Sequence, residues 1–211
     1  MNTPTLSGPA ALAHRAACTL LTTRDRIALL FDGDPGVGKT TLADALALAL
    51  TGTKHAVETV NGQSLNVELV RDWRAGTAYG NLFAKWTVKR VDELDHASPA
   101  AMAELLTFLD TLPKNHAIIA TTNEFGKLRA ASKGRLESRF IRFRVDAPSV
   151  EQTAAHLERT FRITKSQARA IACGAVPEGE LITSGCNIRT AQHDAEALAA
   201  IIAAKKEGSA Q

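Results

Sequence analysis

The segment GDPGVGKTT, Gly33 to Thr41, has the glycine, lysine and threonine spacing of a phosphate-binding loop. An apolar run typical of a buried strand precedes it, and an Ala/Leu-rich run typical of a helix follows it. Glycines let backbone N–H groups turn toward phosphate oxygens, and the start of a helix adds a positive end. We therefore expect ATP or GTP to bind here, in contact with Gly33, Asp34, Pro35, Gly36, Val37, Gly38, Lys39, Thr40 and Thr41.

Lys39 and Thr40 of this loop, together with two acidic residues further along the chain, suit the binding and hydrolysis of a nucleotide. Lys39 is expected to reach the β- and γ-phosphates, and the Thr40 hydroxyl to hold Mg²⁺. In VDELD, which follows a predicted strand, we expect Asp92 to hold the Mg²⁺ through water and Glu93 to polarise the attacking water. A solvated pair of loop carboxylates is the alternative interpretation.

The strand before VDELD carries two charges that a buried parallel strand does not predict. Lys89 and Arg90 occupy positions that should be apolar in the middle of such a sheet. Either their aliphatic stems run outward to water, or the strand lies in a slightly different register.

A polar amide ends the next predicted strand. Asn123 closes the segment IIATTN, and ligands of open parallel sheets bind in the crevice outside the carboxyl ends of the strands. An amide there is suited to orient the water or to contact the γ-phosphate. The alternative is an asparagine that caps a helix or forms a turn.

Two arginines lie four residues apart in GRLESRF. On a helix this spacing would put Arg135 and Arg139 on one face. They form either a solvated helix face or a surface from which one arginine reaches the nucleotide of a neighbouring subunit.

The composition is that of an ordinary globular protein. The chain has 211 residues, of which 45% are hydrophobic and 22% charged, and its net charge is only +3. These values fit one mid-sized domain, alone or with a small appendage, and they exclude disorder and a whole-molecule basic field for nucleic acid. The odd set of cysteines without a CxxC spacing favours free thiols: Cys18, Cys173 and Cys186. With no signal-like start and no long apolar run, we expect a cytoplasmic protein that does not enter membranes.

Predicted strands and helices alternate as far as Pro148. We expect strands at 26–33, 55–62, 84–93, 116–123 and 140–148, and helices at 11–23, 66–76 and 98–112 together with one that ends near Gly52. This alternation predicts an α/β fold with a mainly parallel sheet. Beyond it the pattern is helical only, at 149–162, 164–174 and 187–206. The expected domains are therefore 1–148 and 149–211.

Taken together, these segments resemble an AAA+ ATPase, and within that family the small subunits of clamp loaders. The resemblance covers about residues 26–204 and is carried, in order, by FDGDPGVGKTT, ETVNGQS, VDELD, IIATTN, LESRF and GCNIRTA. It implies a P-loop NTPase fold, in which helices flank a parallel sheet and a small all-helical lid follows. It also implies that ATP, with Mg²⁺, is the nucleotide that is bound and hydrolysed.

The resemblance further implies roles for single residues. Asn61 matches a polar residue that restrains the catalytic glutamate, Asn123 matches sensor 1, and Arg189 matches sensor 2 of the lid. Arg139 lies in SRF, which resembles the Ser-Arg-Cys motif whose arginine serves the ATP of a neighbour, and Arg135 is the fallback. Such an arginine makes hydrolysis depend on assembly, so we expect a homo-oligomer or an AAA+ hetero-oligomer.

The sequence also departs from the clamp-loader pattern. We expect no collar domain of the clamp-loader kind within these 211 residues, the cysteines cannot form the bacterial zinc module, and Phe140 stands where the motif has Cys. A minimal AAA+ ATPase, for example from a phage or mobile element and working in a bacterial or phage-infected cell, fits these departures.

The task that ATP drives is left open among three hypotheses. The first is loading of a clamp or helicase on DNA, with Arg71 and Arg74 as candidate phosphate contacts, although a solvated helix face explains them equally well. The second is remodelling of an unidentified protein client, with Tyr79 and Gly80 as a pore loop. The third is a nucleotide-dependent scaffold, which the water-polarising carboxylate of Glu93 argues against.

Overall fold

The computed structural model describes residues 6, 8–77, 84–161, 163–174 and 187–208 of the chain. The chain divides into two compact units, which are described separately. The first unit is built from Leu12–Gly33 and Lys39–Val145. The second unit is built from Asp146–Gln211 and two short segments, Thr5–Ala11 and Asp34–Gly38.

The first unit contains a five-stranded sheet in which every pairing is parallel. The strand order is β2-β3-β4-β1-β5, so the first strand of the chain lies inside the sheet. All seven residues of the interior strand β4 are buried, as the continuous apolar pattern of a parallel strand requires. The strands are β1 (Arg26–Asp32), β2 (Val57–Asn61), β3 (Thr87–Asp92), β4 (His116–Thr122) and β5 (Ile141–Arg144).

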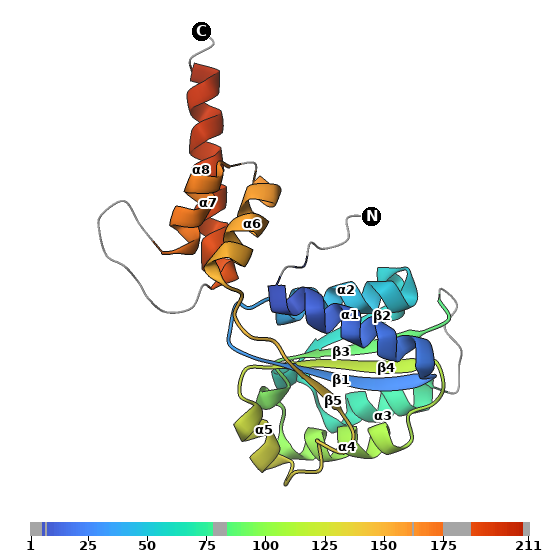
Figure 1. The fold of residues 1–211 in the computed structure, drawn as a ribbon. Coiled ribbons are helices and arrows are strands. Elements are labelled where there is room, and N and C mark those ends of the chain that lie inside the picture. Colours follow the sequence, from blue (N-terminus) through green and yellow to red (C-terminus); the bar gives the residue numbers. More distant parts are fainter. Residues whose placement is uncertain (1–5, 7, 78–83, 162, 175–186, 209–211) are drawn as a thin grey trace. The chain divides into compact units, whose positions relative to one another are not determined.

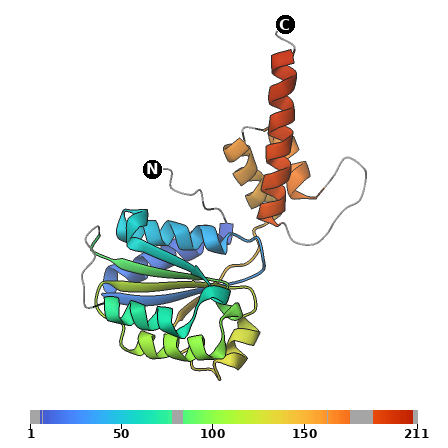
Figure 2. The same cartoon turned by 180° about the vertical axis from the view of Figure 1, so that it is seen from behind.

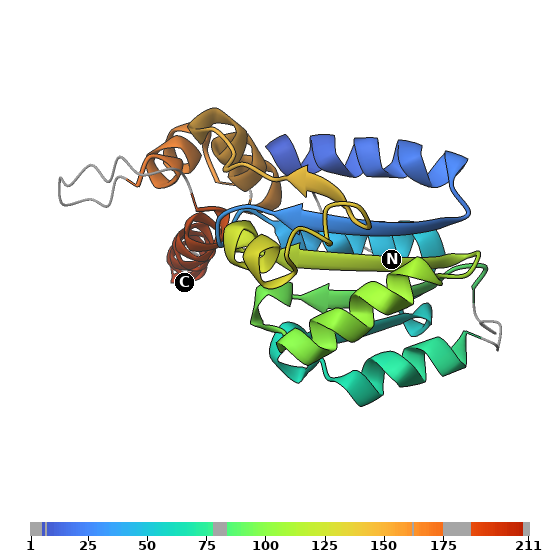
Figure 3. The same ribbon diagram turned by 90° about the horizontal axis from the view of Figure 1, so that it is seen from below.

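Helices cover both faces of this sheet. Helices α1 (Gly8–Thr23) and α2 (Lys39–Thr51) lie on one face, and α3 (Val67–Gly76) and α4 (Pro99–Asp110) lie on the other (Figures 1 and 3). The side chains of Asn66 and Ser98 cap α3 and α4, and each accepts a backbone N–H of the first turn. The core between α3, α4 and the sheet includes Leu30, Val70, Leu105, Phe108 and Ile118.

The described residues after Asp146 in the second unit form three helices, drawn in orange and red in Figure 2. Its helices α6 (Val150–Phe161), α7 (Lys165–Ala172) and α8 (Ile188–Gly208) share a core of mostly small residues, including Ala154, Leu157, Ala168, Ala191 and Ala195. Because alanine side chains are short, the helix backbones can approach closely. A capping box between Thr164 and Gln167 fixes the start of α7.

The predicted α/β fold with a parallel sheet is confirmed, while one local prediction is wrong. Arg135 and Arg139 do not share a helix, because α5 (Phe125–Ala131) ends just before them and a series of turns follows. Lys133 and Gly134 have φ values of 52° and 74°, in the left-handed region that interrupts a right-handed helix. None of the described helices is long and apolar enough to cross a membrane.

Candidate functional site

The carboxyl ends of four neighbouring strands, β2, β3, β4 and β1, meet at one edge of the sheet. In the register, Asn61 of β2 pairs with Asp92 of β3, and Asp32 of β1 pairs with Thr122 of β4. The residues that follow these strand ends therefore leave the sheet side by side. This is the edge where open parallel sheets bind their ligands.

The glycine-rich loop connects β1 to α2, as predicted. Gly36 and Gly38 have φ values of 82° and 96°, which residues with a side chain rarely adopt. Lys39 begins α2, is buried, and donates a hydrogen bond from Nζ to the carbonyl oxygen of Gly33 at 2.8 Å. Thr40 lies exposed on the first turn of the helix. The loop thus presents its lysine and hydroxyl from the start of a helix, where anions bind.

Glu93 directly follows β3 and is held in a strained conformation. Its φ of 54° and ψ of 53° place it in the left-handed region. Its backbone N–H donates to Oγ1 of Thr121 at 3.1 Å. A Cβ added to Gly62, at the start of the short turn η2 (Gly62–Ser64), would lie 2.1 Å from the carbonyl oxygen of Glu93. The ends of β2 and β4 therefore fix the position of this glutamate from both sides.

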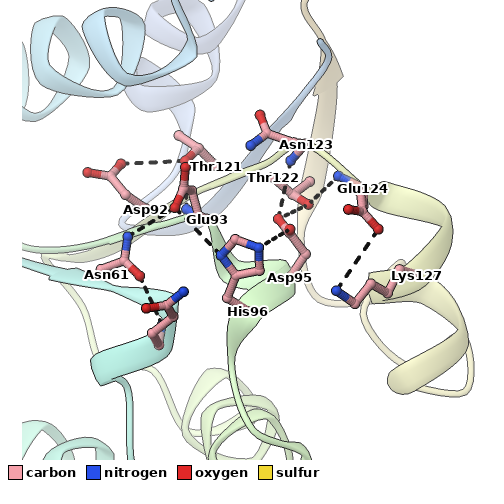
Figure 4. Close-up of polar contacts among 11 residues, drawn as sticks. Asn61, Asp92, Glu93, Asp95, His96, Thr121, Thr122, Asn123, Glu124 and Lys127 are labelled. Atoms are coloured by element: carbon pink, nitrogen blue, oxygen red, sulfur yellow. Dashed lines mark hydrogen bonds and ion pairs between the residues drawn. The ribbon is translucent and has the colours of Figure 1, made fainter. Parts of the chain in front are cut away.

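The carboxylate of Glu93 receives a hydrogen bond from Asn61 (Figure 4). Nδ2 of Asn61 lies 3.2 Å from Oε2 of Glu93. Oδ1 of the same amide accepts the backbone N–H of Gln63 at 3.0 Å, so only the amino group is available to face the carboxylate. The structure thus brings together the two residues that the resemblance pairs.

Asp95 is a residue of this site that the sequence analysis missed. Its side chain is 1% exposed and lies in the turn η3 (Leu94–His96), where it accepts Oγ1–H of Thr122 at 2.6 Å and N–H of Asn123 at 3.2 Å. His96 lies between Asp95 and Glu93, 3.5 Å and 3.6 Å from their carboxylate oxygens (Figure 4). Burial alone would raise the pKa of Asp95, but these hydrogen bonds and His96 outweigh it and lower that pKa.

Asn123 is placed by this buried carboxylate at the end of β4. Its backbone N–H is bound to Asp95, and its side-chain amide points away from Asp95 (Figure 4). The predicted position of Asn123, at the edge shared with Glu93, agrees with the structure. Its contact with a nucleotide stays a prediction.

Asp92 is oriented through both of its carboxylate oxygens. Oδ2 accepts a hydrogen bond from Nη2 of Arg90 at 2.8 Å, and Oδ1 faces Oγ1 of Thr121 at 3.5 Å. Arg90 and Lys89 lie in β3 at the predicted positions, and neither extends alone into water. Arg90 pairs with Asp44 and Asp92, while Lys89 pairs with Glu58 at 2.5 Å and lies over the ring of Trp73.

The two arginines of GRLESRF differ in their surroundings. The guanidinium of Arg139 makes a bidentate ion pair with Asp110, the last residue of α4, through two hydrogen bonds of 2.8 Å. It also donates to the carbonyl oxygen of Arg135 and to Oγ of Ser138. The hydrogen bonds from Arg139 lower the pKa of Asp110. Arg135 is exposed and donates from Nε to the carbonyl oxygen of Ser132 at 3.3 Å.

The candidate DNA contacts lie against an acidic partner. Arg74 bonds to Glu104 of α4 at 2.6 Å, and Nε of Arg71 lies 3.8 Å from the same carboxylate. Arg189 is exposed in the first turn of α8, in the second unit, and its role toward the nucleotide stays a prediction. The predicted pore loop at Tyr79 and Gly80 lies outside the described residues.

Comparison with known protein families identifies the first unit. The family model of the ATPase family associated with various cellular activities (AAA) matches residues 29–145, which is more than half of the chain. The chain belongs to the AAA family. Phe140, which departs from the clamp-loader motif, is buried in the core of this AAA domain.

Two solved structures illustrate the AAA fold of this chain. A DNA polymerase III gamma subunit-related protein from Thermotoga maritima is 16% identical, with a TM-score of 0.55 over 78% of this chain and 58% of that one. The RuvB Holliday junction branch migration motor of Thermotoga maritima is 20% identical, with a TM-score of 0.63 over 93% of this chain and 61% of that one. At this identity the likeness shows the fold alone. No curated protein matches the chain in sequence.

The oxygen ligands at the site fit a magnesium ion. Magnesium prefers carboxylate and hydroxyl oxygens and is usually held by one or two carboxylates together with substrate phosphates. Asp92 supplies a half-buried carboxylate, and Thr40 supplies an exposed hydroxyl at the start of α2. Within the described residues, no group of three or more acidic, histidine or cysteine side chains could hold a metal. Asp92 and Thr40 are thus the kinds of ligand that hold magnesium together with substrate phosphates.

Proposed function

We propose that this AAA protein binds ATP with Mg²⁺ and hydrolyses it, at sites that are completed where subunits meet. The hydrogen bond between Asn61 and Glu93 carries this proposal. A carboxylate that polarises water serves hydrolysis, and an amide that engages this carboxylate is placed to regulate that step. A scaffold that merely binds nucleotide would need neither residue.

The residues divide the chemistry between them. Lys39 and the backbone of 33–41 hold the phosphates, while Thr40 and Asp92 hold the metal. When bound, Mg²⁺ neutralises charge on the β- and γ-phosphate oxygens. Glu93 accepts a hydrogen bond from the attacking water, and Asn123 orients it. While Asn61 donates to the Glu93 carboxylate, the amide occupies the oxygen that would accept a hydrogen bond from the attacking water, so hydrolysis is slow until the amide is withdrawn.

An arginine from a neighbouring subunit completes the site in this proposal. Arg139 remains the first candidate because it belongs to the SRF segment, and Arg135 is the second because it is exposed. The ion pair between Arg139 and Asp110 limits when Arg139 is available to a neighbouring subunit. A neighbour's γ-phosphate must compete with the Asp110 carboxylate for the same guanidinium. Arg189 of α8 would add a second cation to the phosphates.

We further propose that the assembly acts on DNA, as a loader of a clamp or helicase. The names of the two similar structures, a DNA polymerase III gamma subunit-related protein and a Holliday junction branch migration motor, support a role at DNA. Arg71 and Arg74 of α3, which share the carboxylate of Glu104, are the candidate contacts for DNA phosphates in this proposal. A protein-remodelling role is the alternative, with no described residue that favours it.

The rate of ATP hydrolysis per subunit, measured against protein concentration with and without primed DNA, tests the proposal. A rate that rises with concentration, rises again with DNA and is abolished in Glu93→Gln is expected. A flat rate would refute completion of the site by a neighbour, and indifference to DNA would refute the loader. A wild-type rate no faster than that of Glu93→Gln would refute hydrolysis itself.

A further inference from the structure

Arg90 is a buried cation in the middle of the sheet that the proposed chemistry does not explain. Strand β3 lies between β2 and β4, where apolar residues are the rule. Arg90 is only 9% exposed. Burying a guanidinium costs solvation free energy, and well-placed carboxylates must offset that cost.

The two ends of the Arg90 fork contact carboxylates on different elements. Nη2 donates to Oδ2 of Asp92, two residues later on the same face of β3, at 2.8 Å. Nη1 donates to Oδ1 of Asp44 on α2. Nε has no hydrogen-bond partner among the described residues, so the two terminal amino groups carry the polar contacts of this side chain.

The position of Asp44 on α2 shows which face of the helix Arg90 bridges to Asp92. Asp44 follows Thr40 by four residues, so both lie on one face of the helix. Arg90 therefore links the Asp92 carboxylate to the helix face that carries the Thr40 hydroxyl. The planar fork of a guanidinium fixes both the distance and the orientation of the two carboxylates it joins, which a single ammonium cannot do.

We propose that Arg90 is a positioning residue for magnesium. It holds the Asp92 carboxylate in a fixed orientation toward the Thr40 face of α2, so that the oxygen ligands are in place before the nucleotide and its metal arrive. This inference rests on the proposed binding of ATP with Mg²⁺, and it adds a residue that touches neither of them. With Asp44 and Asp92 the bridge carries a net charge of about −1, which leaves the site attractive to a cation.

The test uses Arg90→Met and a matched control in the same strand. Lys89→Met removes a neighbouring cation that is paired with Glu58. Lys89 lies on the opposite face of β3 from Arg90, away from the site. Binding of ATP that carries a fluorescent N-methylanthraniloyl group is titrated with Mg²⁺ and is measured again in EDTA. Removing a residue that orients a metal ligand costs about 10–100-fold in metal affinity.

We expect Arg90→Met to need about tenfold more Mg²⁺ for half-maximal nucleotide binding, with its affinity in EDTA unchanged. Arg90→Lys, which keeps the charge without the fork, should recover only part of the difference. Lys89→Met should match the wild type in its Mg²⁺ requirement. A role limited to stability would shift the unfolding of both methionine variants and the Mg²⁺ requirement of neither.

Four outcomes would overturn the inference. An unchanged Mg²⁺ requirement in Arg90→Met shows that Arg90 only stabilises the fold, and a lower requirement shows that it only competes with the metal. If Arg90→Met does not fold, Asp44→Asn decides, because it leaves Arg90 paired with Asp92. A requirement that rises severalfold in Asp44→Asn supports the bridge, and an unchanged one overturns it. A wild type whose nucleotide binding ignores Mg²⁺ refutes the proposed function as well.

Discussion

Gly62→Ala probes the contact that places Glu93. The added Cβ would lie 2.1 Å from the carbonyl oxygen of Glu93, and this oxygen belongs to the backbone, so no side-chain rotation relieves the clash. Nonbonded carbons and oxygens stay more than 3 Å apart, and the turn that carries Glu93 must therefore move by about 1 Å. Overpacking of this kind costs about 1–3 kcal/mol of folding free energy. A displacement of about 1 Å at a catalytic group costs on the order of 10²-fold in rate.

Urea unfolding and ATP turnover at saturating nucleotide measure the two effects separately. Gly126→Ala is the matched control, because Gly126 lies in α5 with nothing within 4 Å of the added Cβ. This control should be up to about 1 kcal/mol more stable than the wild type and keep its turnover. Wild-type stability of Gly62→Ala would refute the close approach. Reduced stability with normal turnover per folded subunit would show that this contact does not position Glu93.

Three further predictions concern the restraint, the trans arginine and the buried carboxylate. Asn61→Ala should raise basal turnover about tenfold, since a hydrogen bond to a charged group contributes roughly 1.5 kcal/mol; lower turnover would mean that the amide holds the glutamate in its working position. Arg139→Ala should bind ATP normally but lose about 10³-fold in turnover. Mixing Arg139→Ala subunits with Lys39→Ala subunits should restore activity. Normal turnover of Arg139→Ala alone would refute the assignment of Arg139 as the trans arginine. In the same assay Asp110→Asn, which weakens the competing ion pair, should reach its plateau rate at a lower protein concentration. The pKa of Asp95 is lower in the folded protein than the ordinary aspartate pKa of about 3.9, so at any pH above about 3.9 its carboxylate stabilises the fold. This stabilisation is lost as the pH falls through the lower folded-state pKa. Urea unfolding from about pH 6 to pH 3 should therefore show a shallower acid loss in Asp95→Asn than in the wild type, and parallel curves would contradict the assignment.

The sheet and the chemical residues at its edge could be predicted because their signals are local. The apolar run of β1, the glycines after it and the acidic pair after β3 are contiguous in sequence, and parallel strands bring their carboxyl ends to one edge. The pairing of Asn61 with Glu93 could be predicted only from the family resemblance. The amide and the carboxylate lie far apart in the chain, and only the register of β2 and β3 joins them.

The parts that sequence could not provide depend on distant partners. Arg90 looked misplaced in β3 because its second carboxylate partner, Asp44, belongs to α2, which is distant from β3 in the sequence. Arg139 looked like one half of a helix face because nothing local reveals the left-handed backbone at Lys133 or the ion pair with Asp110. Asp95 gave no signal, since an acidic residue in a turn is ordinarily solvated.

The interior place of β1 has a consequence for how the chain folds during synthesis. Its neighbours are β4 and β5, so Arg26 pairs with His116, and the strand before the phosphate-binding loop finds no sheet partner until most of the domain exists. At roughly 5–20 residues per second, ribosomes leave this apolar strand unpaired for seconds. Strands β2, β3 and β4 can associate with one another first, and β1 must then add to their edge. The nucleotide loop is therefore among the last features to form, and a nascent chain that stops short of β4 exposes an unpaired apolar strand, which is prone to aggregate.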